Sequence, residues 1–129
     1  MQDEGSQVLS LLTDVRPGMT VIDACAGAGG KSLHLAALME NRGRLVALDV
    51  DARKLDQLGE RSRRAGVTIT EAIACPPDAA PRGVAESNAA VVLVDAPCSG
   101  TGVFRRSPWL KLGLTENEVH GLAPTQSLP

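Results

Sequence analysis

The sequence predicts an α/β protein in which a mostly parallel sheet of about four strands is flanked by helices. The order of the elements predicts this class, and the composition predicts its core. Short apolar runs alternate along the chain with segments whose apolar residues recur at helical spacing. Aromatic residues make up only 2% of the chain, so we expect a core of Leu, Val and Ala. A sheet of this kind binds its ligands at the carboxyl ends of its strands.

The first predicted elements are a helix and a strand. Residues 4–15 carry apolar residues at helical spacing, namely Val8, Leu11, Leu12 and Val15. The segment RPGMT then breaks this pattern with proline and glycine, and the apolar strand 21–24 follows it. The chain next enters a run of small residues.

A second helix and a second strand come after that run. Residues 31–41 are predicted to be helical, and the helix is expected to be closed by Gly43. Residues 44–50 are almost continuously apolar, which is typical of a strand buried on both faces.

The rest of the chain predicts one more long helix, two more strands and a short final helix. Residues 51–66 open with an acidic residue and close with arginines and a glycine, which matches the helix dipole. Residues 67–74 alternate as a third strand, and residues 89–95 form an apolar fourth strand after a proline-rich segment. A short helix is expected after Thr115.

Length and composition favour one soluble domain. The 129 residues contain no apolar run of about 18 residues and no basic-then-apolar leader, so we expect a cytoplasmic protein without a membrane segment. Cys25, Cys75 and Cys98 are too widely spaced for a Cys-x-x-Cys pair. With only two histidines, His34 and His120, we expect no metal site.

The formal net charge of −2 gives no general attraction to nucleic acid. Binding of RNA would therefore need local basic clusters. One candidate is the trio Arg61, Arg63 and Arg64, although such a trio is more typical of a solvated helix face. The other candidate is the pair Arg105 and Arg106.

A glycine-rich loop after the first strand would let the backbone lie close to a ligand. It comprises Cys25, Ala26, Gly27, Ala28, Gly29, Gly30 and Lys31. A phosphate loop would need a glycine at Cys25, and a dinucleotide fingerprint would need one at Ser32. A third template, the acidic-x-Gly-x-Gly-x-Gly pattern associated with S-adenosylmethionine binding, finds Asp23 followed by Gly27 and Gly29.

Asp49 ends the second predicted strand and suits a nucleoside cofactor. Its carboxylate is placed to accept hydrogen bonds from both ribose hydroxyls. The helix start after Gly30 would offer N–H groups to the methionine carboxylate. Asp49 could instead cap the next helix, although Asp51 could do so equally well.

A second motif, VLVDAPCSGTG, places Asp95 and Cys98 at the end of the fourth strand. A buried structural cysteine usually lies mid-element among apolar neighbours. Cys98 lies instead in a predicted turn, where a thiolate could be reached and activated. The residues alone would make Cys98 the nucleophile of a covalent mechanism.

Three stretches resemble the RNA (cytosine-5) methyltransferases, in particular bacterial ribosomal RNA methyltransferases of that family. They are QDEGSQ at residues 2–7, DACAGAGGKS at 23–32 and DAPCSGTGVFRRSP at 95–108. The resemblance implies a Rossmann-like S-adenosylmethionine-dependent methyltransferase fold. It also implies methylation of carbon 5 of a cytosine in RNA, either ribosomal or transfer RNA.

The resemblance implies a role for each site residue. The loop 25–31 would bind S-adenosyl-L-methionine, Asp49 would hold its ribose, and Asp95 would lie between the cofactor and the target cytosine. Arg105 and Arg106 would contact RNA. The attacking cysteine of the family belongs to a later Thr-Cys motif, and no Thr-Cys pair occurs in this sequence. Cys98 would then be the residue that assists release of the product.

The sequence departs from the family pattern in two places. Cys75 stands where the family usually has an aspartate near the adenine, unless Asp78 takes that place through a shifted register. Trp109 follows Pro108, where the family commonly has an aspartate. These departures affect adenine recognition and the surroundings of the substrate base.

We expect residues 1–129 to form only part of a methyltransferase domain. Members of the family have a seven-stranded sheet and an N-terminal RNA-binding extension. In the usual order of that sheet the fourth strand lies inside it, so in this chain the fourth strand would show an unpaired apolar edge. We expect the complete enzyme to be a monomer. Two alternatives remain: a degenerate phosphate-loop ATPase, and a non-catalytic remnant that binds cofactor or RNA.

Overall fold

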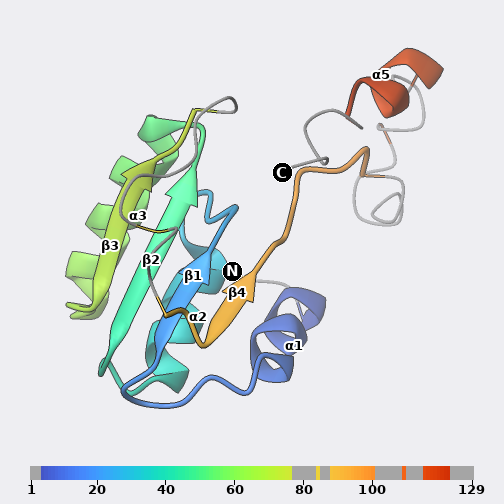
Figure 1. Ribbon diagram of the computed structural model, residues 1–129. Helices are drawn as coiled ribbons and strands as arrows, with labels where there is room; N and C mark the ends of the chain where they lie inside the picture. Colours follow the sequence, from blue (N-terminus) through green and yellow to red (C-terminus); the bar gives the residue numbers. More distant parts are fainter. Residues whose placement is uncertain (1–3, 77–83, 85–87, 101–108, 110–114, 123–129) are drawn as a thin grey trace. The chain divides into compact units, whose positions relative to one another are not determined.

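The computed structural model describes residues 4–76, 84, 88–100, 109 and 115–122. The chain divides into two compact units, Met1–Asp95 and Ala96–Pro129. The first unit holds the sheet and its helices (Figure 1). In chain order its described elements are α1 (Glu4–Leu12), β1 (Thr20–Asp23), α2 (Gly30–Leu38), β2 (Arg44–Asp49), α3 (Ala52–Ala65), β3 (Thr70–Ala74) and β4 (Val91–Leu93). The second unit contains α5 (Glu116–Gly121), which begins directly after Thr115 as predicted.

The sheet is parallel throughout its described part, as the alternation of strands and helices predicted. Its four strands lie in the order β3, β2, β1, β4. Ile22 of β1 is in register with Val46 of β2 on one side and with Val92 of β4 on the other. The two central strands are therefore β1 and β2, which end in Asp23 and Asp49.

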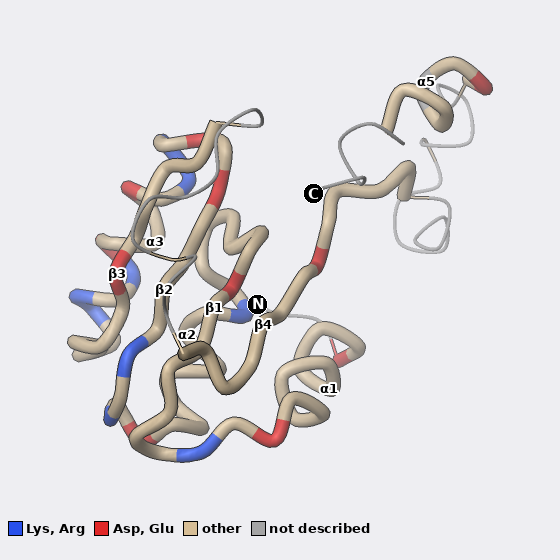
Figure 2. Tube along the Cα trace, in the orientation of Figure 1, with Lys and Arg blue, Asp and Glu red and all other residues tan. Residues whose placement is uncertain are grey.

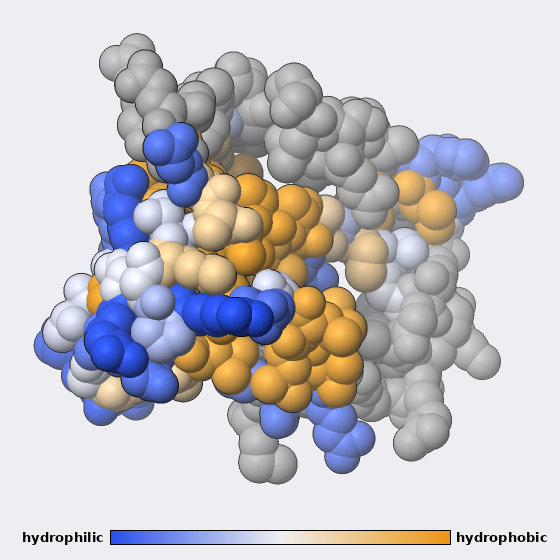
Figure 3. Space-filling model, turned by 60° about the horizontal axis from the view of Figure 1, so that its bottom comes forward, coloured by the Kyte–Doolittle hydropathy of each residue, from blue (hydrophilic) through white to orange (hydrophobic). Residues whose placement is uncertain are grey.

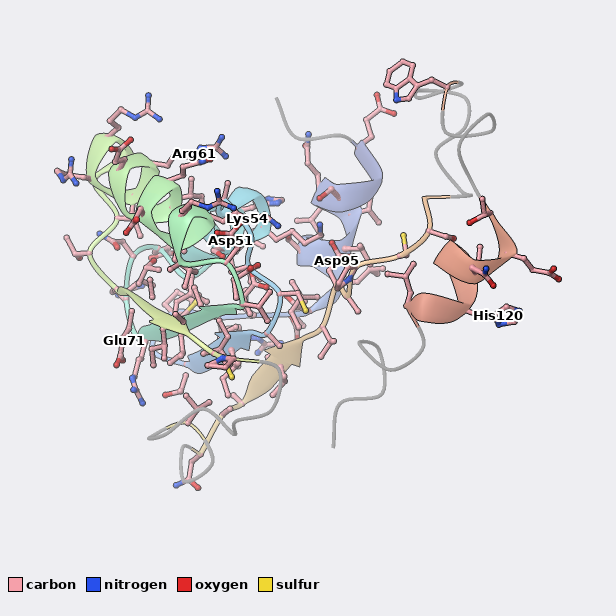
Figure 4. All side chains as sticks on the ribbon, turned by 90° about the horizontal axis from the view of Figure 1, so that it is seen from above. Asp51, Lys54, Arg61, Glu71, Asp95 and His120 are labelled. Carbon is pink, nitrogen blue, oxygen red and sulfur yellow. The ribbon has the colours of Figure 1, made fainter. Side chains whose placement is uncertain are left out.

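Successive residues of the central strands face two different layers. Val21 and Leu45 pack with α2, and Ala47 packs with Leu55 and Leu58 of α3. The alternate residues pack on the opposite face with Val84, and they are Ile22, Val46 and Leu48. Figure 4 shows α1, α2 and α3 on the same side of the strands. The site end of the sheet is thus supported by α2 and α3.

Helix α1 is shorter than the predicted segment 4–15. It ends at Leu12 because the chain turns at Asp14, whose φ is +49°. Ser10 is fully buried, whereas Val8, Leu11 and Leu12 are at least half exposed. Figure 3, in which the bottom of Figure 1 comes forward, shows a broad apolar surface in orange. The predicted helix is therefore present, but of its four spaced apolar residues it is Val15, beyond the end of the helix, that lies in the core.

The prediction that Gly43 closes α2 is wrong. The helix ends at Leu38, and Glu40 and Asn41 follow it with φ values of +52° and +53°. Gly43 is needed for another reason: its φ is +111°, and a Cβ atom there would lie 2.3 Å from the carbonyl oxygen of Met19. Its missing side chain lets the chain pass close to the segment that enters β1.

Helix α3 begins and ends as predicted. Asp51 is its N-cap and accepts a hydrogen bond from the Arg53 amide over 3.0 Å. Gly66 closes it in the left-handed conformation, with a φ of +70°.

At the edge of the described sheet, β4 pairs with β1, and Val92 and Val94 are each 56% exposed. This agrees with the apolar edge expected for the fourth strand. Among the described helices, none is both long and apolar enough to cross a membrane.

Candidate functional site

The site lies in the first unit, at the carboxyl ends of the parallel strands. Asp23 ends β1, Asp49 ends β2, and Asp95 comes two residues after β4. Because the strands are parallel, these ends lie at the same end of the sheet, where Figure 2 marks acidic positions in red. The glycine-rich loop joins β1 to α2 at the same end. The fold therefore brings together the residues of this unit that were predicted to bind cofactor.

Backbone hydrogen bonds fix the loop against the end of β2. The amide of Ala26 donates to the carbonyl oxygen of Leu48 over 2.8 Å. The amide of Gly29 donates to the carbonyl oxygen of Ala26 over 2.9 Å. The amide of Gly27 donates to Oδ2 of Asp49 over 2.8 Å. The loop is thus held by the residue that was expected to hold a ribose.

Both carboxylate oxygens of Asp49 have a defined orientation. Oδ2 accepts from Gly27, and Oδ1 accepts from the amide of Asp51 over 2.9 Å. Because Asp51 caps α3 itself, the alternative that Asp49 is the helix cap is wrong. Asp49 remains partly exposed, and each of its oxygens retains a lone pair for a further donor.

The start of α2 requires glycine. Gly29 has a φ of +87°, and a Cβ atom there would lie 2.2 Å from Cδ1 of Leu58. Gly29 is also the N-cap, and among the described residues it has no side-chain capping bond. The first amides of α2 are therefore left without a side-chain acceptor, an arrangement that suits an incoming carboxylate.

Asp23 is fully buried beneath the loop. Its Oδ2 accepts a hydrogen bond from Oγ of Ser32 over 2.7 Å, and its Oδ1 has no hydrogen-bond partner among the described residues. Burial raises the pKa of Asp23, while the hydrogen bond from Ser32 and the charge of Lys31 oppose that rise. Asp23 therefore ties the first turn of α2 to β1 from within the core.

Lys31 and Asp95 form an ion pair. The Lys31 side chain is 18% exposed and that of Asp95 is 45% exposed. The pair joins the first turn of α2 to the segment after β4. In a phosphate loop this lysine would face phosphate groups, whereas here its ammonium group is directed at a carboxylate.

The three cysteines have different surroundings. Burial, followed by the charges of Asp23, Asp49 and Asp95, raises the pKa of the Cys25 thiol. Cys25 is therefore held as a thiol and suits a structural position in the loop. Cys75 follows β3, and its amide donates to the carbonyl oxygen of Asp49 over 3.0 Å.

In the second unit, Cys98 is exposed and Trp109 is 65% exposed. The predicted residues Asp78, Arg105 and Arg106 lie outside the described residues.

Sequence reasoning missed the role of Arg61. Its Nη1 atom donates to the carbonyl oxygen of Ala28 over 3.1 Å, so this arginine contacts the glycine-rich loop. The basic trio on α3 had been interpreted as one solvated cluster. The spacing of Leu58 and Arg61, which puts both on one side of a helix, was the available signal.

The chain matches a known protein family over most of its length. Residues 10–128 match the family model described as 16S rRNA methyltransferase RsmB/F. The probable ribosomal RNA small subunit methyltransferase B of Bacillus subtilis is 40% identical over 98% of this chain. The mouse 28S rRNA (cytosine-C(5))-methyltransferase is 36% identical over 82% of it. The chain spans 28% and 23% of the length of these two relatives.

A solved structure shows the same architecture. The crystal structure of NSun6 from Pyrococcus horikoshii with SFG is 28% identical and has a TM-score of 0.80. The match covers 97% of this chain and 31% of that one. Solved structures of this fold include S-adenosylmethionine-dependent methyltransferases. The predicted fold class, an incomplete Rossmann-like methyltransferase fold, is therefore confirmed.

Proposed function

The chain belongs to the RsmB/F family of 16S rRNA methyltransferases, and on that premise we propose that it is the cofactor-binding part of an RNA cytosine-5 methyltransferase. The proposed reaction transfers a methyl group from S-adenosylmethionine to carbon 5 of a cytosine in ribosomal RNA. The mouse relative, named as a cytosine-C5 enzyme, supports the position of methylation. The Bacillus relative, named as a small subunit enzyme, supports the ribosomal substrate.

The residues at the carboxyl end of the sheet fit S-adenosylmethionine. A Cβ atom at Gly27 or at Gly30 would meet nothing within 4 Å, so the loop leaves open space there in which a ligand could approach the main chain. The uncapped amides at the start of α2 would receive the methionine carboxylate. Asp49 would accept hydrogen bonds from the ribose hydroxyls. When bound, the cofactor supplies an electrophilic methyl group.

The orientation of Asp49 is the observation that carries this proposal. Two backbone amides, those of Gly27 and Asp51, hold its carboxylate at 2.8 and 2.9 Å. A carboxylate that is already oriented loses little side-chain entropy when it binds a diol. The same residue also holds the loop, so ribose binding and loop conformation would depend on one side chain.

Cytosine chemistry gives Cys98 and Asp95 their proposed roles. Carbon 5 is a poor nucleophile, so a thiolate must first add to carbon 6 of the ring. The family resemblance gives this attack to a later Thr-Cys motif and gives Cys98 the later step, in which the adduct is released. Asp95 would act as an acid near the ring nitrogen. Arg105 and Arg106 would contact RNA phosphates.

Isothermal titration with S-adenosylhomocysteine tests the proposal. We expect saturable binding to the chain and none with ATP and magnesium. Asp49→Ala should weaken binding roughly 10- to 100-fold, because it removes a charged acceptor with two hydrogen bonds to the ligand. Asp56→Ala, which changes an exposed aspartate on α3, is the matched control.

Three results would contradict the proposal. Binding of ATP alone would indicate a phosphate-loop ATPase, and binding of neither ligand to the folded chain would indicate a remnant. Equal affinity of S-adenosylhomocysteine for wild type and Asp49→Ala would show that the carboxylate does not hold the ligand. Thermal unfolding of each variant establishes that the folded state is present.

A further inference from the structure

Helix α3 contacts the glycine-rich loop at two points. Leu58 lies against Gly29, and Arg61 donates a hydrogen bond to the carbonyl oxygen of Ala28. These two residues are three positions apart, so they lie on the same side of the helix. Figure 4 shows Arg61 on the part of α3 that faces α2.

The bond from Arg61 fixes one end of a peptide plane whose other end is fixed independently. The Ala28 carbonyl and the Gly29 amide belong to the same planar peptide unit. The carbonyl oxygen accepts from Nη1 of Arg61 over 3.1 Å, and the Gly29 amide donates to Ala26 over 2.9 Å. With both ends held, this peptide unit has one preferred orientation.

That orientation determines how α2 begins. Gly29 has a φ of +87° and is the N-cap, so the plane before it sets the direction of the first turn. The amides of that turn follow the loop directly, and they are the donors that the proposed function assigns to the methionine carboxylate. Rotation of the 28–29 peptide would turn these donors away.

Arg61 differs in this respect from the arginines that follow it. Arg63 and Arg64 lie in the last turn of α3, and neither contacts another described side chain or the loop through a hydrogen bond or ion pair. The three share one helix and one charge, so they provide a matched comparison.

We propose that Arg61 is a positioning residue for the cofactor site, acting through the Ala28 carbonyl without contact with the ligand. This inference rests on the proposed function. According to this inference, α3 contributes to cofactor affinity in addition to the residues at the strand ends. Its prediction is that loss of the guanidinium group relaxes the 28–29 peptide and weakens cofactor binding.

Amide hydrogen exchange, measured without any ligand, tests whether loss of the guanidinium group relaxes the 28–29 peptide. In Arg61→Met, which keeps the aliphatic stem, the Gly29 amide should exchange roughly 3- to 10-fold faster than in wild type. Arg61→Lys retains a donor and should restore part of the protection. Arg64→Met removes a charge from the same helix and should leave Gly29 unchanged. Equal exchange in Arg61→Met and wild type would overturn the inference.

Titration of the same variants with S-adenosylhomocysteine tests whether loss of the guanidinium group weakens cofactor binding. Arg61→Met should bind roughly 3- to 10-fold more weakly than wild type, Arg61→Lys should fall between them, and Arg64→Met should match wild type. Equal affinity of Arg61→Met and wild type would overturn the inference alone. An equal loss in Arg64→Met would show a general charge effect and would also overturn it. Absence of binding to wild type would overturn the proposed function and this inference together.

Discussion

Oγ of Ser32 donates a hydrogen bond to Oδ2 of Asp23 over 2.7 Å, and neither side chain is exposed to solvent. The bond joins the first turn of α2 to the end of β1 beneath the glycine-rich loop. A buried carboxyl group that loses its partner keeps the full cost of its removal from water. The pair therefore belongs to the support of the cofactor site as well as to the core.

Ser32→Ala should lower the free energy of unfolding by roughly 1–3 kcal/mol, because it removes the hydroxyl donor from the buried carboxyl group of Asp23. Ser62→Ala is the matched control. Ser62 is also a buried serine on a helix, but its hydroxyl has no hydrogen-bond partner among the described residues. Its replacement by alanine should not lower the free energy of unfolding, because it removes a buried hydroxyl that has no such partner. Urea unfolding at neutral pH compares the two, and equal losses would contradict the role of the bond.

Asp23 should make stability fall as the pH rises. Its pKa is raised above the ordinary value of 3.8, mainly by burial, so the folded chain holds this proton to a higher pH than the unfolded chain does. The stabilising contribution is complete below 3.8 and is lost as the pH passes through the raised pKa.

Asp23→Asn removes this titration and keeps an acceptor for Ser32. The stability of Asp23→Asn minus that of wild type should therefore increase with pH above 3.8 and then level off. Urea unfolding of both proteins across this range measures the difference. A difference that is constant with pH would show that Asp23 has an ordinary pKa in the folded protein.

Gly29→Ala should destabilise the protein by roughly 1–3 kcal/mol, because it forces a side chain into a left-handed conformation and against Leu58. Gly59→Ala, on α3, is the matched change. A Cβ atom at Gly59 meets nothing within 4 Å, and alanine favours the helix by up to about 1 kcal/mol. The midpoint temperature of thermal unfolding should therefore fall in Gly29→Ala and rise in Gly59→Ala. A stabilising Gly29→Ala would contradict the described loop conformation.

The thiol groups should react in a defined order. Because its pKa is raised and it is partly buried, Cys25 should be alkylated by iodoacetamide more slowly than the exposed Cys98. Peptide mass spectrometry after timed alkylation at mildly alkaline pH measures both rates. Faster reaction of Cys25 would mean that this thiol is activated and would contradict its structural assignment.

The sequence predicted the central strands because both of their faces are buried. Leu45, Val46 and Ala47 form a continuous apolar run, and all three have no exposed surface. Asp23 and Asp49 are the last residues of these two strands and therefore lie at the carboxyl end of the sheet. For this reason the position of the candidate site could also be predicted.

The contacts between elements could not be predicted in the same way. The role of Arg61 depends on how α3 crosses the loop, and the pairing of Lys31 with Asp95 depends on the order of the strands. Helix α1 shows the same difficulty, since helical spacing does not say which side is buried. Gly43 was expected to close a helix, whereas the close approach to Met19 explains it.

The most direct test of the account is a titration of the isotopically labelled chain with S-adenosylhomocysteine, followed through its amide resonances. The account predicts saturable shifts at Gly27, Gly29 and the first turn of α2, and at Asp49 and Asp51, with little change along α1. Saturable shifts confined to other parts of the sheet would contradict it. So would a response at the loop to ATP and magnesium in place of S-adenosylhomocysteine.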